Sequence, residues 1–159
     1  MTNTFCIPRI RIRAQVALAG RRVREVSLFL GERAQRHGGH ERPSDVLESS
    51  RGFLPALDGD ALVFINLEQV TMVTVAAELE YTADEMALLE AACAQDTSRR
   101  IGVILEDGTA LSGEVAYVMP EGQRRVQDFL NCNERFFRLR DGDHARLVNK
   151  SRVLWVRQD

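Results

Sequence analysis

The sequence predicts a mostly β protein in which two duplicated small five-stranded barrels are joined by one linker helix. Three observations lead to this prediction. A stretch of 32 residues recurs later in the chain, short apolar runs alternate with turn residues in both copies, and the segment between the copies has apolar residues at helical spacing. The 159 residues are enough for one ordinary domain or two very small ones.

Composition and charge are those of an ordinary folded protein. Hydrophobic residues make up 45% of the chain and charged residues 28%, with a net charge of −2. This balance provides neither a basic excess for nucleic acid nor an acidic tail. No run approaches the ~18 apolar residues of a membrane span, and Arg9, Arg11 and Arg13 interrupt any signal-peptide pattern. We therefore expect a cytoplasmic, bacterial protein.

The repeat is the strongest signal in the sequence. Residues 42–73 align with residues 125–156 without a gap, and ten of the 32 positions are identical. The identities include Phe53 with Phe136 and the two Asp-Gly-Asp segments, and many other pairs are apolar in both copies. Because a repeated segment forms one structural unit twice, we expect Phe53 and Phe136 to be buried in equivalent places.

The repeat also sets the expected domain boundaries. Upstream of the gapless stretch, EVSLFL from Glu25 aligns with EVAYVM from Glu114 after a change of offset. We expect a first small β-barrel over residues 1–75, a linker with an amphipathic helix over residues 76–98, and a second small β-barrel over residues 99–159.

Each copy contains patterns for five short strands. In the second copy, RRIGVILEDG predicts a strand that enters a turn at Asp107-Gly108, and ALSGEVAYVM predicts the returning strand with a bend or bulge at Gly113. RFFRLRDGD predicts a third strand that ends in a glycine-centred turn. ARLVNK and RVLWV predict two strands around a tight turn at Asn149, since asparagine tolerates the left-handed conformation. A sheet this short must curl to bury one face, which favours a small barrel.

Between the second and third strands, each copy carries a short helical pattern. RRVQDFLNCNE predicts one turn with Asp128 as its N-cap, and RPSDVLESS predicts the same turn with Ser44 or Asp45 as the cap. The aspartate shared by both copies is therefore interpreted as a cap rather than a catalytic acid.

The segment between the copies predicts a helix over residues 83–95. Thr82 and Glu85 have the spacing of a capping box. Met86, Leu89 and Cys93 recur at helical spacing and would form a packing face.

The order of elements resembles that of the Sm-like and SH3-like small β-barrels. VILEDGTALSGEV is similar to the first half of such a domain and ARLVNKSRVLWV to the second half, while RRVQDFLN is similar to an uncharacterised bacterial branch with a D-x-L-N…F pattern. The resemblance covers nearly all of the second copy and the first copy from about Arg9 to Val75. It implies small barrels, but the RNA-binding residues of the family do not transfer, because its usual binding turn is occupied by residues 149–151 and 66–68.

Sequence motifs for catalysis and metal binding were weighed against simpler interpretations. The Asp-Gly-Asp segments at 58–60 and 141–143 lack the remaining ligands of a calcium loop and are interpreted as turns. His37 and His40 flank two glycines without an evident third ligand, and no C-x-x-C pair occurs. There is no G-x-S-x-G, P-loop or G-x-G-x-x-G motif. We expect no enzyme activity, no cofactor and no metal.

Two function hypotheses remain. The leading one is a non-enzymatic protein-interaction or scaffold module, because ALVFINLEQVTMVTV has more apolar residues than one barrel can bury. The partner would be another protein or a second copy of the chain, or the surplus would be covered by the second barrel or the linker helix. Candidate partner-binding residues are Phe64, Met72, Arg124 and Arg125.

The alternative hypothesis is an Sm-like RNA- or DNA-binding regulator. It would use arginine clusters, such as Arg21, Arg22 and Arg24, to contact phosphates. Aromatic residues would supply stacking faces, namely Phe136, Phe137, Tyr117 or Trp155. We favour a core position for these aromatics and paired surface positions for the arginines.

Overall fold

The computed structural model describes residues 9–31, 39–94, 100–115 and 126–158. The first half contains β1 (Arg9–Leu18), β2 (Arg22–Gly31), α1 (Pro43–Ser49), β3 (Phe53–Asp58), β4 (Ala61–Asn66), the 3-10 turn η1 (Leu67–Gln69) and β5 (Val70–Ala76). Two helices follow, α2 (Ala77–Glu80) and α3 (Ala83–Ala94). The second half contains β6 (Arg100–Leu105), β7 (Ala110–Glu114), α4 (Val126–Leu130), β8 (Phe136–Asp141), β9 (His144–Asn149), η2 (Lys150–Arg152) and β10 (Val153–Gln158).

The protein is mostly β, and its strands form one antiparallel ten-stranded sheet. The strand order is β10-β6-β7-β8-β9-β5-β1-β2-β3-β4. The sheet is open: within the described residues, β4 does not pair with β5 and β9 does not pair with β10. The expected pair of separate closed barrels is therefore not observed: β5 pairs with β1 of its own half on one side and with β9 of the other half, rather than β4, on the other side.

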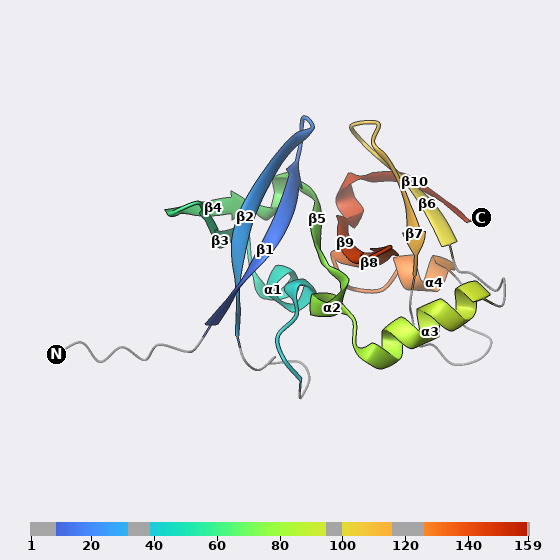
Figure 1. Cartoon of the computed structure of the whole chain (residues 1–159). Coiled ribbons are helices and arrows are strands. Elements are labelled where there is room, and N and C mark those ends of the chain that lie inside the picture. Colours follow the sequence, from blue (N-terminus) through green and yellow to red (C-terminus); the bar gives the residue numbers. More distant parts are fainter. Residues whose placement is uncertain (1–8, 32–38, 95–99, 116–125, 159) are drawn as a thin grey trace.

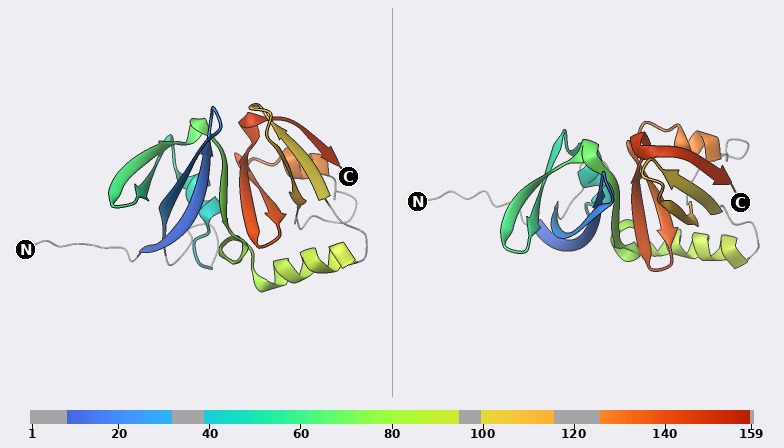
Figure 2. Two further views of the ribbon diagram at one scale, coloured as in Figure 1. Left: turned by 45° about the horizontal axis from the view of Figure 1, so that its top comes forward. Right: turned by 90° about the horizontal axis from the view of Figure 1, so that it is seen from above.

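The sheet is divided into two strongly curved groups of five strands that lie side by side (Figures 1 and 2). Within each group the fifth strand precedes the first, so both halves have the order fifth, first, second, third, fourth. A register shift occurs in the same place in both halves. It lies at Thr71 where β5 pairs with β1, and at Leu154 where β10 pairs with β6. An internal duplication predicts these shared details.

Strand pairing changes one part of the expected alignment. Ser27 lies opposite Arg13 in the first half, and Glu114 lies opposite Arg100 in the second. Arg13 and Arg100 hold the same place in their halves, so Glu114 corresponds in the structure to Ser27. The sequence alignment instead pairs Glu114 with Glu25. The difference is two residues, which keeps the same face of the strand inward.

Turn residues explain several of the strand boundaries. Gly59 and Gly142 have φ angles of 61° and 59°, and each lies in the turn between the third and fourth strands of its half, as predicted. Gly108 has φ of 87° in the predicted Asp107-Gly108 turn. Gly113 has a different role from the expected bend: a Cβ atom there would lie 2.7 Å from the carbonyl oxygen of Arg140 on β8. Glycine lets the two strands approach closely.

The short helices begin differently from the prediction. Arg42 is the N-cap of α1, and Asp45 is its third residue, whose carboxylate accepts a 2.8 Å hydrogen bond from the Arg42 N–H. Asp128 is likewise the third residue of α4. Asp45 therefore satisfies a backbone donor from inside the first turn, where a negative charge is also favoured by the helix dipole.

The linker helix α3 spans residues 83–94, close to the predicted range. Its capping box is present: the Thr82 N–H donates to Glu85, and the Glu85 N–H donates to the Thr82 hydroxyl. Leu89 is buried, while Leu88 is 62% exposed. The side chain of Cys93 lies outside the described part. No helix in the described residues has the length and apolar character to cross a membrane.

Candidate interaction site

The two halves meet where β5 runs antiparallel to β9. The register places Val73 opposite Leu147 and Val75 opposite Ala145. All four side chains are almost completely buried and belong to one core cluster. This junction is therefore a strand pairing with a hydrophobic face, the arrangement by which sheet edges recruit other strands.

Side chains cross the junction in both directions. Phe136, Ala145 and Leu147 of the second half pack in the core of the first half. Met72 of the first half packs in the core of the second half, where Val148 also lies. Each half thus completes the core of the other.

Polar contacts reinforce the junction at the end of α1. The guanidinium of Arg135 donates from Nη2 to the carbonyl oxygens of Leu47 and Ser50, both at 2.7 Å. The Phe136 N–H donates to Glu48 Oε1 at 2.9 Å. Two of these bonds satisfy carbonyls at the C-terminal end of a helix, which otherwise lack partners.

Two equivalent asparagines show how the junction differs from an open edge. The Oδ1 atom of Asn149 accepts from the Ser151 N–H, and Oδ1 of Asn66 accepts from the Glu68 N–H, each at 3.1 Å. Both residues have negative φ, so they act as caps of 3-10 turns rather than as the predicted left-handed residues. The Nδ2 atom of Asn149 crosses the junction to the Val70 carbonyl oxygen at 2.8 Å. Within the described residues, Nδ2 of Asn66 has no hydrogen-bond partner.

A buried carboxylate lies beside the junction. Glu80 of α2 is 1% exposed, and its carboxylate accepts hydrogen bonds from the N–H and the hydroxyl of Ser44 on α1. Arg138 of β8 lies 3.6 Å from it. Burial raises the pKa of Glu80, and the Ser44 hydrogen bond and the Arg138 charge oppose that shift. The carboxylate therefore joins elements of both halves. We find no sequence signal that would have identified it.

The groups around Glu80 form one charged cluster. Glu85 of α3 lies 3.7 Å from Arg138 and 3.5 Å from Arg42. The guanidinium of Arg138 also lies over the ring of Tyr81, 5.1 Å from its centroid. Burial raises the pKa of Tyr81 well above its usual value.

The two ends of the sheet are open edges. Among the residues that the structure describes, β4 pairs only with β3, and β10 pairs only with β6. Most of the large exposed hydrophobic side chains of the described residues lie on or beside these two strands: Phe53, Leu62, Phe64, Leu154 and Trp155. Apolar side chains beside unpaired backbone groups are the features of a strand-binding surface.

Equivalent residues are buried to different extents in the two halves. Phe136 is 2% exposed, whereas Phe53 is 60% exposed, so the prediction that both are buried is wrong for Phe53. The cause is position in the sheet: β8 and β9 lie against β5 and α1, while β4 is the last strand of the sheet in the described part of the chain. Two further pairs differ in the opposite direction: Val70 and Leu47 of the first half are buried, whereas Val153 and Leu130 of the second half are partly buried.

The predicted partner-binding residues separate into three groups. Phe64 is 62% exposed on the open edge β4. Met72 is not on a free surface, because the second half covers it. Arg124 and Arg125 lie outside the described residues. The apolar surplus of this segment is thus divided: the second half covers β5, and β4 remains open.

The residues proposed for nucleic-acid binding are mostly engaged elsewhere. Arg24 pairs with Asp58 at 3.2 Å, and Arg21 donates to the Asp107 carbonyl oxygen. Phe136 and Phe137 are buried, as the core interpretation predicted, whereas Trp155 is exposed; Tyr117 lies outside the described part.

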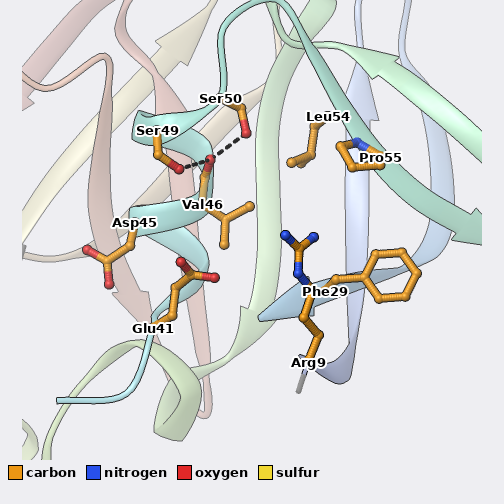
Figure 3. A pocket seen from close by; sticks show the side chains of 9 residues that line it. All are labelled: Arg9, Phe29, Glu41, Asp45, Val46, Ser49, Ser50, Leu54 and Pro55. Carbon is orange, nitrogen blue, oxygen red and sulfur yellow. Dashed lines mark hydrogen bonds between the residues drawn. The ribbon is translucent and has the colours of Figure 1, made fainter. Parts of the chain in front are cut away.

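A cavity of about 450 Å³ lies between α1 and the first-half strands. It is lined by Arg9, Phe29, Glu41, Asp45, Val46, Ser49, Ser50, Leu54 and Pro55 (Figure 3). Both serine hydroxyls donate to the Val46 carbonyl oxygen, and Glu41 accepts from the Gly31 N–H. These polar groups satisfy local backbone atoms. In the described part of the chain, no three potential metal ligands form a group.

The chain matches no family model, no curated protein and no solved structure.

Proposed function

We propose that this chain is a non-enzymatic protein-interaction module, a scaffold of two duplicated small-barrel units that binds partner strands at its open sheet edges. The observation that carries the proposal is the position of five exposed hydrophobic residues on or beside β4 and β10. Soluble proteins normally protect such edges with charges, proline or a covering element. An edge that is instead apolar is suited to a partner.

The junction between β5 and β9 supports the proposal physically. Within this chain, the edge of β5 already pairs with the edge of β9, and the pairing buries apolar side chains of both strands. Main-chain pairing supplies affinity in such contacts, and the side chains on alternate positions supply selectivity.

The experiment that tests the proposal is site-specific photo-crosslinking in the living host. A photoreactive amino acid replaces Phe64 in one variant and Trp155 in another. Because both side chains are exposed, these replacements leave the fold intact. We expect protein adducts from both variants.

A matched control carries the same group at Arg11, which is exposed on β1 away from both edges. It should give few adducts. Absence of protein adducts from both edge positions would overturn the proposal, and adducts to RNA or DNA instead of protein would favour the regulator hypothesis.

A further inference from the structure

We infer that the partner of β4 is β10 of a second copy of this chain, so that copies associate head to tail. The inference rests on the proposed function and names the partner of the same edges. It follows from the repeat: β4 is the equivalent of β9, and β10 is the equivalent of β5. The internal β5–β9 junction is therefore a template for contact between copies.

The exposed residues of β3 and β4 match the residues that cross the internal junction. Phe53 and Phe64 occupy the places of Phe136 and Leu147, both of which are buried in the core of the neighbouring half. Phe53 and Phe64 are 60% and 62% exposed. If the second half of another copy lay against β4 in the way that the first half lies against β9, it would bury both side chains.

The exposed residues of β10 match β5 in the same way. Trp155 occupies the place of Met72, which inserts into the core of the adjoining half, and Val156 occupies the place of Val73. The register shift at Leu154, where β10 pairs with β6, repeats the shift at Thr71, where β5 pairs with β1, so β10 holds the same place in its half as β5 does.

Asn66 supplies a second, independent observation. It keeps the capping bond that Asn149 makes through Oδ1, but its Nδ2 atom has no partner in the described part of the chain. The equivalent Nδ2 of Asn149 donates across the junction to the carbonyl of Val70. In a head-to-tail contact, the Val153 carbonyl of the second copy would be the corresponding acceptor.

The template predicts the register of the contact. Val73 lies opposite Leu147 and Val75 opposite Ala145 inside the chain. Transferring these pairs by the repeat places Val156 opposite Phe64 and Gln158 opposite Leu62. Not every junction contact is repeated, because Gly52 stands where Arg135 binds the end of α1. We therefore expect the contact between copies to be weaker than the internal junction.

The two edges lie at opposite ends of the molecule, so β10 cannot reach β4 of its own chain (Figures 1 and 2). Association through two different edges is heterologous. It gives a closed ring when the rotation between copies closes, and a filament when it does not.

Disulfide trapping tests the register. In a background with Cys6, Cys93 and Cys132 replaced by serine, one chain carries Leu62→Cys and another carries Gln158→Cys. Both positions are exposed, so the variants should fold. Mixing them under mild oxidation should give a covalent dimer. The control pair, Ala61→Cys with Gln158→Cys, is shifted by one residue and points to opposite faces, and should crosslink much more slowly.

Light scattering over a range of concentrations supplies the second measurement. The wild-type mass should rise with concentration, and Phe64→Arg should weaken the association at least about tenfold because it places a charge in a desolvated contact. Leu88→Arg is the matched control, since Leu88 is equally exposed but lies on α3. It should associate like the wild type.

The outcomes separate this inference from the proposed function. A monomer at every concentration, combined with photo-crosslinks from Phe64 to a different protein, would overturn the inference and leave the proposed function standing. Crosslinks between two Leu62→Cys chains, without the mixed dimer, would show edge-to-edge pairing of β4 and also overturn it. Absence of protein adducts would overturn both.

Discussion

Phe53 and Phe136 occupy the same position of the repeat, yet one is 60% exposed and the other 2% exposed. Both begin the third strand of their half, and both lie opposite an asparagine in the fourth strand. What differs is the neighbour: the first half covers β8 and β9, whereas no strand of the described residues pairs with the outer edge of β4. Burial here is a property of the assembled sheet, which the local sequence does not encode.

The largest expected effect of this difference is on stability. Phe136→Ala should lower the free energy of unfolding by about 3–5 kcal/mol, because it removes a large side chain from a packed core. Phe53→Ala should change it by less than about 0.5 kcal/mol, as for other exposed positions. Denaturant unfolding of dilute protein measures both. Equal losses in the two variants would show that Phe53 is covered in the monomer.

The asparagines provide the next contrast. Aspartate keeps the Oδ1 acceptor of the cap but removes the Nδ2 donor. Asn149→Asp therefore leaves the Val70 carbonyl without its partner and buries a charge, at an expected cost of about 1–3 kcal/mol or more. Asn66→Asp should be nearly neutral in dilute solution, because its Nδ2 has no partner in the described residues. The same unfolding measurement compares them, and a large loss in Asn66→Asp would contradict the contrast.

These contrasts indicate how far the sequence alone determines the structure. Local signals were sufficient for the turns at Gly59 and Gly142 and for α3 with its Thr82–Glu85 capping box, because each depends on a few neighbouring residues. In the structure, the same order of strands and short helices occurs in both halves of the chain. The pairing of β5 with β9 could not be predicted, since strand pairing between distant segments leaves no periodic trace.

The candidate site was only partly predictable for the same reason. The apolar surplus of residues 61–75 predicted that a neighbour was needed, but not that β5 would receive one within the chain while β4 would not. Of the two predicted partner-binding residues in this segment, Phe64 is exposed on β4, whereas Met72 is covered by the second half. Glu80 was missed, because its burial depends on Ser44 and Arg138, which are distant in sequence.

The buried carboxylate of Glu80, beside the junction of the two halves, should make the stability of the protein depend on pH. Burial raises its pKa in the folded protein above the unfolded value, so the folded state binds the proton more strongly. Protonation of Glu80 therefore adds to the free energy of unfolding. This contribution is present in full below the pKa of Glu80 in the unfolded chain, and it is lost as the pH rises through the higher pKa in the folded protein. The charges of Arg138 and Arg42 favour the ionised carboxylate and oppose this shift, and Glu85 pairs with the same Arg138.

The measurement is the free energy of unfolding of the wild type and of Glu80→Gln from acid to neutral pH. Glutamine has nearly the same shape but does not titrate. The stability of the wild type relative to the variant should therefore decrease as pH rises from the acid range. A difference that stays constant or increases with pH would contradict the raised pKa.

The smallest expected effect concerns a position where the two halves should behave alike. Gly59 and Gly142 have φ near +60°, and a Cβ atom at either would meet no atom within 4 Å. Gly59→Ala and Gly142→Ala should each cost about 1 kcal/mol, because the left-handed conformation strains an L-residue and no contact changes. The Ala77 N–H donates to the Asp143 carbonyl oxygen in the second turn, but this bond does not involve Gly142 itself, so the two losses should be similar in dilute protein. Unequal losses would show that the two halves differ in more than the presence of a neighbouring half. The contrast between Phe53 and Phe136 would then need a cause other than the missing neighbour at β4.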